Sequence, residues 1–302
     1  MLNAKNPTSS ASRDQDAASA GHDLAKTGGI RCLSHAPDSS PPSHNVADSS
    51  GSEAAALRLE KRTHLNTAKY RINIIDYGHG VGEIGWSFIS TTQPVKASRG
   101  KSENRVKNED RSMRRSRSKM RKLILTTKAD HLLTLTYRDN VTDFAQSAKD
   151  FSSFIRKVKF SLPDFIYIAV AEQQKRGAWH WHLAVRGRQD VNLLRLAWRS
   201  VVGDGNIDVN APRSAQKGRQ FALIQYLGKY LGKGFADGEH KLNARRFRAS
   251  QGIKIPHLSI ELPNNDRNVL GFAIETLRDK VGSVGHVWTS DDCTAGWACS
   301  WK

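Results

Sequence analysis

The chain has 302 residues, of which 38% are hydrophobic, and carries a formal net charge of +18. This length allows one or two domains with a sizeable core, and no run of residues approaches the roughly 18 uninterrupted apolar positions of a membrane span. The first residues lack the apolar core of a signal peptide, and three cysteines are too few for a disulfide framework, so we expect a cytoplasmic protein rather than a membrane or secreted one.

Residues 1–65 are predicted to form a disordered leader. Five basic side chains stand against seven acidic ones in residues 1–60, where Ser, Ala, Asp and Pro are frequent and apolar periodicity is absent. Such a composition cannot bury enough apolar surface to offset the entropy of ordering the chain. The positive charge of the protein therefore originates further along the sequence.

Residues 66–122 form a segment whose structure the sequence defines poorly. Gly80, Gly82 and Gly85 have the spacing of a dinucleotide-binding loop, but β-branched residues, Ser and Pro follow where that motif requires a helix. We therefore reject a dinucleotide site and expect no organic cofactor. No loop of the kind that holds the phosphates of ATP occurs in the sequence.

A dense basic run closes this segment. Residues 61–130 hold 17 basic and six acidic side chains. The run is either a solvated arm or a contact for a polyanion, and we favour nucleic acid over an anionic membrane because the run shows no large apolar face. The candidate DNA-binding residues are Arg111, Arg114, Arg115, Arg117, Lys119, Arg121 and Lys122.

Periodicity becomes legible over residues 123–256. Thr142 or Asp143 is placed to cap the first helix, and Asp190 to cap the second. The order indicates an α+β sandwich with a mainly antiparallel sheet and helices on one face. The predicted elements are a strand at 132–137, a helix from 144 to about 161, strands at 165–171 and 179–185, a helix after 190, a strand at 206–209 and a helix at 221–231.

His180 and His182 flank a tryptophan on the strand predicted at 179–185. The two-residue period of a strand turns both imidazoles to the same face, which is the geometry for two ligands of one cation. With 11 histidines in the chain, a pair of this kind arises readily by composition. The pair alone therefore does not establish a metal site.

The register of the preceding hairpin decides whether a carboxylate joins the two histidines. A three-residue loop at 175–177 places Glu172 opposite His180, whereas a two-residue turn pairs it with Trp181 and directs it to the other face. We favour the three-residue loop because the glutamate then gains partners. Two imidazoles and one carboxylate suit Mg²⁺ or Mn²⁺; the alternative is a surface glutamate at a strand end.

Tyr226 and Tyr230 lie four residues apart on the last predicted helix, so their phenols project from one face. Such a stripe is either the packing face of an amphipathic helix or a pair of nucleophiles. Lys229 and Lys233 repeat the same spacing beside them. These cations are predicted to favour the phenolate and to neutralise a phosphate.

The three patterns together resemble the HUH endonucleases, specifically the rolling-circle replication initiators. They are LLTLT at residues 132–136, HWH at 180–182 and Y-x-x-K-Y-x-x-K at 226–233, in the initiator order. The double tyrosine resembles the initiators of single-stranded DNA phages and related plasmids, whereas relaxases place the tyrosine before the histidines. The resemblance covers roughly residues 115–256.

The resemblance implies a ferredoxin-like or RRM-like HUH endonuclease domain at 123–256, an enzyme that nicks and rejoins single-stranded origin DNA. Glu172, His180 and His182 would hold Mg²⁺ or Mn²⁺, and Tyr226 or Tyr230 would attack the phosphorus, with the two lysines assisting by charge. The implied partners are an origin or hairpin in single-stranded DNA, a host helicase and a polymerase.

Two other functions fit the same sequence. One is a transposase of the same superfamily, and the other is a non-enzymatic basic protein that binds nucleic acid. Trp179 or Trp181 is either a stacking platform for a base or part of the core. Residues 257–302 form a C-terminal tail to which the sequence assigns no structure.

Overall fold

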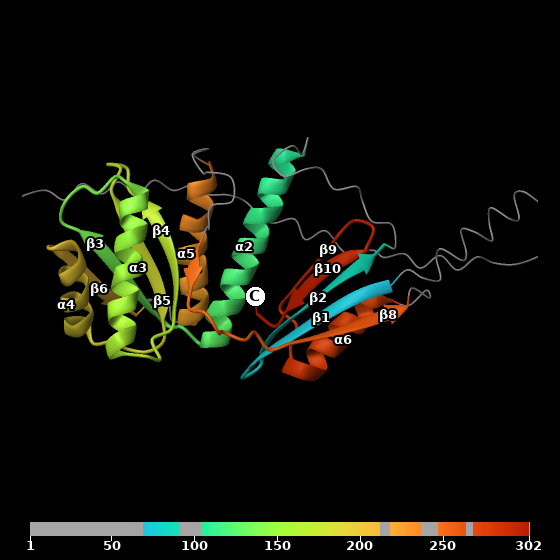
Figure 1. Cartoon of the computed structure of the whole chain (residues 1–302). Helices are drawn as coiled ribbons and strands as arrows, with labels where there is room; N and C mark the ends of the chain where they lie inside the picture. Colours follow the sequence, from blue (N-terminus) through green and yellow to red (C-terminus); the bar gives the residue numbers. More distant parts are fainter. Residues whose placement is uncertain (1–68, 91–103, 212–217, 237–246, 264–267, 302) are drawn as a thin grey trace, which may run out of the picture. The chain divides into compact units, whose positions relative to one another are not determined.

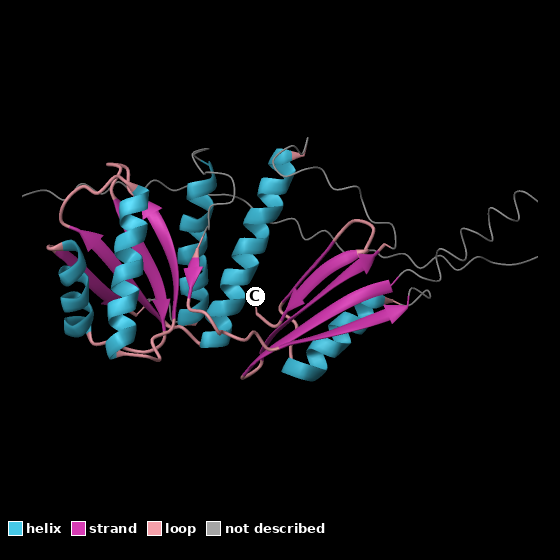
Figure 2. Ribbon diagram, in the orientation of Figure 1, coloured by secondary structure: helices cyan, strands magenta, loops and turns pink. Residues whose placement is uncertain are grey.

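The computed structural model describes residues 69–90, 104–211, 218–236, 247–263 and 268–301 (Figure 1). The leader predicted at 1–65 lies outside this part of the chain. The described residues form two antiparallel five-stranded sheets and five helices, which confirms the α+β class (Figure 2). Within these residues, every helix is too short or too polar to cross a membrane.

Sheet B is built from the segment in which the sequence shows clear periodicity, and its strands follow the order β6-β3-β5-β4-β7. The chain order strand, helix, strand, strand, helix, strand and this spatial order together give a ferredoxin-like arrangement. Its elements are β3 (His131–Tyr137), α3 (Phe144–Ser161), β4 (Tyr167–Gln173), β5 (Trp179–Val185), α4 (Val191–Val202) and β6 (Gly205–Asn210), with the short β7 (Arg248–Ala249) at the edge.

Both predicted helix caps of this domain are present. The Asp143 carboxylate accepts hydrogen bonds from the backbone N–H groups of Ala145 and Gln146 at the start of α3. Asp190 does the same for Asn192 and Leu193 at the start of α4. Each carboxylate satisfies two N–H groups that the first helical turn leaves without a partner.

Helices cover both faces of sheet B, so the expectation of helices on one face is wrong. On one face Leu133, Leu183 and Trp181 pack against α3 and α4. On the other, Ile168 and Ala184 pack against α2 (Arg105–Thr127) and α5 (Arg219–Ala236). The strands of this sheet bury both faces, and their apolar composition is what requires a second helical layer.

Helix α2 contains the basic run to which the sequence assigned no structure. Met120, Leu123 and Ile124 are buried against sheet B, while most cations of the helix point to solvent. The sequence did not predict this helix because its apolar residues occur mainly in the last two turns, and the rest is too polar to show an apolar stripe.

Sheet A joins the two segments to which the sequence assigned no fold. Helix α6 (Val269–Val281) packs on one face through Ala273 and Leu277. The strand order is β8-β1-β2-β10-β9, formed by β1 (Lys69–Gly78), β2 (Val81–Ile89), β8 (His257–Pro263), β9 (His286–Thr289) and β10 (Ala295–Cys299).

The glycine-rich stretch at 78–85 is the turn of the β1–β2 hairpin and the start of β2. Gly78, His79 and Gly80 all have positive φ values, of 82°, 54° and 74°. Gly82 gives α6 room, because a Cβ atom there would lie 2.6 Å from Cγ1 of Val281. The glycines therefore shape a hairpin, in agreement with the rejection of a dinucleotide loop.

Candidate functional site

The β4–β5 hairpin has the predicted three-residue loop. The N–H of Gln174 donates to the carbonyl of Ala178 at 2.8 Å, and Gly177 supplies the left-handed position with φ +88°. Glu172 consequently lies opposite His180 in the β4–β5 register. The strand period then places Glu172, His180 and His182 on the face of sheet B that α5 covers.

His182 is held from both ring nitrogens. Its Nε2 lies 2.7 Å from Oε2 of Glu172, and the Thr134 hydroxyl lies 3.3 Å from its Nδ1. Burial lowers the pKa of His182 even though the Glu172 carboxylate acts in the opposite direction. The ring is therefore neutral at pH 7, and the network assigns Nε2–H as the donor to Glu172 and Nδ1 as the acceptor from Thr134.

His180 lies beside this pair with one nitrogen unsatisfied. Its Nδ1 is 3.3 Å from Nε2 of Gln174, whereas its Nε2 is buried with no hydrogen-bond partner among the described residues. Burial, and then the neighbouring His182, lower the pKa of His180. An unsatisfied buried imidazole nitrogen costs about 1–3 kcal/mol, and it is the kind of atom that a ligand would satisfy.

The donor set fits a divalent cation by type and by face, but it is not preassembled. No three His, Cys, Asp or Glu side chains within the described residues already converge as a metal site. Glu172 and His182 instead bond to each other, and of the two imidazoles only His180 keeps a nitrogen without a partner among described atoms. A cation that binds here has to displace the proton that Glu172 and His182 share.

Tyr226 and Tyr230 of α5 lie directly over His182. The Tyr230 ring stacks on the imidazole with centroids 4.7 Å apart and planes at 15°, and the Tyr226 ring meets it edge-on at 5.4 Å. The two phenol rings are 4.8 Å apart. The structure thus brings both tyrosines of the third motif against the histidines of the second.

The electrostatic prediction for the phenols is wrong for Tyr226. Burial, followed by a hydrogen bond with Tyr230, raises the pKa of Tyr226, so the phenol rather than the phenolate is favoured. Lys229 is exposed on α5, where water screens its charge. Lys233 belongs to α5, but its side chain lies outside the described part of the chain.

The sequence reasoning did not identify the residues that position the imidazoles. Thr134 lies directly opposite His182 in the β3–β5 register and meets it from the neighbouring strand. Gln174 performs a similar role for His180. The alternation of Thr and Leu in β3 was the available signal, because it places Thr134 on the face opposite to the core leucines.

Of the two tryptophans considered for stacking on a base, Trp181 belongs to the core. It is 2% exposed and stacks on Phe151 at 4.1 Å. Trp179 lies at the start of β5, where its indole N–H donates to the carbonyl of Thr142 and its ring packs against Phe144.

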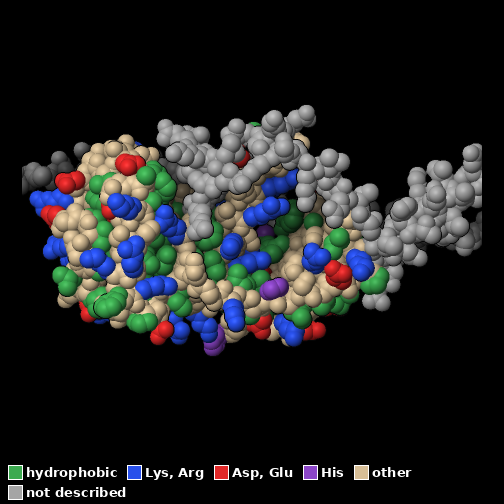
Figure 3. All heavy atoms as spheres, in the orientation of Figure 1, with side chains coloured by type: hydrophobic (Ala, Val, Ile, Leu, Met, Phe, Trp, Pro, Cys, Tyr) green, Lys and Arg blue, Asp and Glu red, His purple; other side chains and the backbone are tan. Residues whose placement is uncertain are grey.

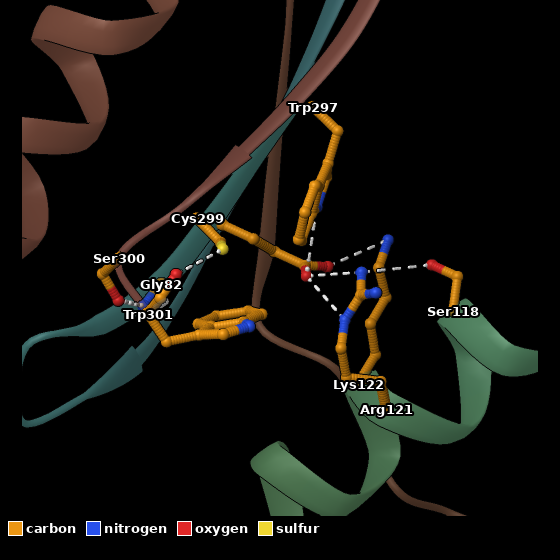
Figure 4. A network of polar contacts seen from close by, with 9 residues as sticks. Gly82, Ser118, Arg121, Lys122, Trp297, Cys299, Ser300 and Trp301 are labelled. Atoms are coloured by element: carbon orange, nitrogen blue, oxygen red, sulfur yellow. Dashed lines mark hydrogen bonds and ion pairs between the residues drawn. The ribbon is translucent and has the colours of Figure 1, made fainter. Parts of the chain in front are cut away.

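The seven candidate DNA-binding cations of α2 divide into two groups. Arg121 and Lys122 bind the carboxylate of Glu83 on sheet A, at 2.7 Å and 3.5 Å (Figure 4). Glu83 is 2% exposed, so it holds both cations in place. The exposed members, which remain available to a polyanion, are Arg111, Arg114, Arg115, Arg117 and Lys119.

Comparison with known families gives one match. Residues 130–235 match the family model of the replication-associated proteins of the ORF2 type. No curated protein and no solved structure matched the chain. The matched segment runs from β3 into α5 and contains the histidine and tyrosine motifs, which supports a role in DNA replication, with DNA as the partner.

Proposed function

We propose that the chain is a rolling-circle replication initiator that nicks single-stranded origin DNA and rejoins it through a phosphotyrosine. The observation that carries the proposal is the packing of Tyr226 and Tyr230 on His182, whose other partner is Glu172. Candidate nucleophiles and candidate cation ligands thus meet on one face of sheet B. The family match over residues 130–235 supports the assignment to replication.

The proposed ligands are Glu172, His180 and His182, which would hold Mg²⁺ or Mn²⁺. When bound, the cation would polarise a nonbridging oxygen of the scissile phosphate and stabilise the negative charge that develops there. Thr134 and Gln174 would fix the orientation of the imidazoles, as neighbours of metal-binding histidines generally do.

One of the two tyrosines attacks the phosphorus in this proposal. Its phenolic oxygen forms a bond to phosphorus while the bond to the 3′ oxygen breaks, which leaves a 5′-phosphotyrosine and a 3′-hydroxyl. The phenol loses a proton and the 3′ oxygen gains one, so the step needs no net proton and no external energy. Because the pKa of Tyr226 is raised, removal of its proton has to accompany the attack.

The second tyrosine would allow a second cleavage and transfer of the strand after one round of synthesis. The free 3′-hydroxyl would prime a host polymerase. The sequence holds no ATP-binding loop of the P-loop type, so duplex unwinding is assigned to a host helicase. The exposed cations of α2 would contact backbone phosphates.

Covalent capture tests the nucleophiles and does not require the origin sequence to be known. The protein is incubated with Mn²⁺ and a pool of single-stranded oligonucleotides with randomised centres, and adducts that resist denaturation are isolated and sequenced. The expected result is an adduct on a restricted set of sequences, abolished in Tyr226→Phe/Tyr230→Phe.

A matched control and two further outcomes complete the test. Tyr70→Phe removes a hydroxyl from a tyrosine on sheet A that packs edge-on against Phe88, and it should leave the adduct unchanged. An adduct of equal yield in Tyr226→Phe/Tyr230→Phe would refute the nucleophiles. Adduct formation that persists in EDTA, or in His180→Ala/His182→Ala, would refute the metal site.

A further inference from the structure

A second pocket lies where α2, α5 and sheet A meet, and the proposed nicking site does not use it. Its volume is about 210 Å³, below the range of roughly 300–1,000 Å³ typical of sites for drug-sized ligands. It therefore suits one flat ring system. The pocket is lined by Arg121, Phe221, Ile224, Gln225, His286, Trp297, Cys299 and Trp301.

Aromatic faces dominate this lining. Trp301 lies 5.3 Å from Phe221 and 5.9 Å from Trp297, measured between ring centroids. His286 lies 5.9 Å from Trp297 on the neighbouring strand. Rings from α5, β9, β10 and the segment after β10 thus surround one space, which is the arrangement that favours a planar aromatic ligand.

Arg121, the guanidinium in the pocket lining, is already neutralised. It lies 4.7 Å over the Trp297 ring, and its Nε and Nη2 both donate to Oε2 of Glu83, as Figure 4 shows. A phosphate entering the pocket would meet this carboxylate nearby. Arg121 therefore offers a flat stacking surface rather than an anion site, and a neutral ring fits better than a phosphate.

Helix α5 connects the pocket to the proposed nicking site. Phe221, Ile224 and Gln225 line the pocket, and Tyr226 follows Gln225 directly. The amide of Gln225 is exposed and can donate and accept hydrogen bonds at the edge of a bound ring. Lys and Arg side chains are prominent on the visible face of the space-filling view (Figure 3), as a bound polyanion requires.

We propose that this pocket holds one unstacked nucleobase of the single-stranded DNA on which the tyrosines act. Trp301 and Phe221 supply the stacking faces, Gln225 contacts the base edge, and the exposed cations of α2 hold the adjoining phosphates. This inference rests on the proposed function for the identity of the strand, but base binding itself needs neither metal nor cleavage.

The test compares binding of a base with binding of the backbone alone. Tyr226→Phe/Tyr230→Phe protein in EDTA is titrated with fluorescent dT20 and with an abasic 20-mer of equal length, so nothing is cut. Trp301→Leu and Phe221→Leu are introduced separately into this background. Each should weaken dT20 binding by about 5- to 100-fold, the range for loss of one stacked base, and leave binding of the abasic strand unchanged.

Phe160→Leu is the matched control, because Phe160 is 91% exposed on α3 and lies outside the pocket. Unchanged dT20 affinity in both pocket variants would overturn the proposal. So would an equal loss for the abasic strand, or an equal effect of Phe160→Leu. A failed adduct assay would refute the nicking function alone, since this binding test runs without nicking.

Discussion

Replacing Glu83 with glutamine should destabilise the fold strongly for a single isosteric change. Oε2 of Glu83 accepts from Arg121 at 2.7 Å and 3.1 Å and from the Trp297 indole at 3.3 Å, and Lys122 lies 3.5 Å from Oε1. At 2.7 Å and an effective dielectric constant of about 20, the gross attraction is about 6 kcal/mol.

Desolvation offsets much of that attraction, and removing one partner of a buried pair costs about 3–5 kcal/mol. Arg121 and Lys122 are 21% and 30% exposed, so both can recover some hydration when the carboxylate charge is lost. Glutamine also keeps the side-chain volume and one acceptor. We therefore expect Glu83→Gln to lower the free energy of unfolding by about 2–3 kcal/mol.

Urea denaturation at pH 7, followed by circular dichroism, measures this loss, and the slope of the transition should be unchanged. Glu261→Gln is the control, because Glu261 pairs with Lys69 and Arg71 on the same sheet but is 44% exposed; its transition midpoint should not move. Equal effects of the two substitutions would refute the reasoning, since burial would then have no influence.

Three further predictions concern the site and the DNA surface. Arg114→Gln/Arg115→Gln should weaken single-stranded DNA binding and reduce the slope of log K against log[salt] by about 0.7 for each lost phosphate contact; an unchanged slope would exclude both residues from the contact. Thr134→Val removes the hydroxyl near Nδ1 of His182 and should raise the Kd for Mn²⁺ about 10-fold or more in calorimetry; unchanged affinity would count against a positioning role. In EDTA, stability should be level above about pH 6.5 and fall below it, because the unfolded chain takes up protons that His180 and His182, with lowered pKa values, resist; His180→Gln/His182→Gln should flatten that slope in pH-dependent urea titrations, and an unaltered slope would contradict the assignment.

The sequence predicted sheet B well because its signals are local. The four longer strands there show apolar alternation or a continuous apolar run, and Asp143 and Asp190 mark the starts of helices. The pairing of Glu172 with His180 follows from the length of a hairpin loop and was therefore also predictable. Turn chemistry and the two-residue period suffice for such a relation.

Sheet A was not predictable by the same means because its pairings are distant in sequence. Strand β1 pairs with β8, so Ile72 lies opposite Ile260, and β2 pairs with β10, so Trp86 lies opposite Gly296. Strands β9 and β10 are short, and no turn connects them to β1 or β2. A local pattern cannot specify such partners, and packing against α6 decides them instead.

The basic run of α2 shows why residue type alone does not identify a DNA contact. Met120, Leu123 and Ile124 fix the rotation of α2 about its axis by packing on sheet B, and that rotation directs Arg121 to Glu83. The same rotation fixes the directions of the exposed cations one to three turns earlier. A helix loses little backbone entropy when it binds a ligand, whereas a disordered arm loses about 1–2 kcal/mol per ordered residue. The helix therefore presents its cations to the phosphates at a lower entropic cost than the arm that the sequence suggested.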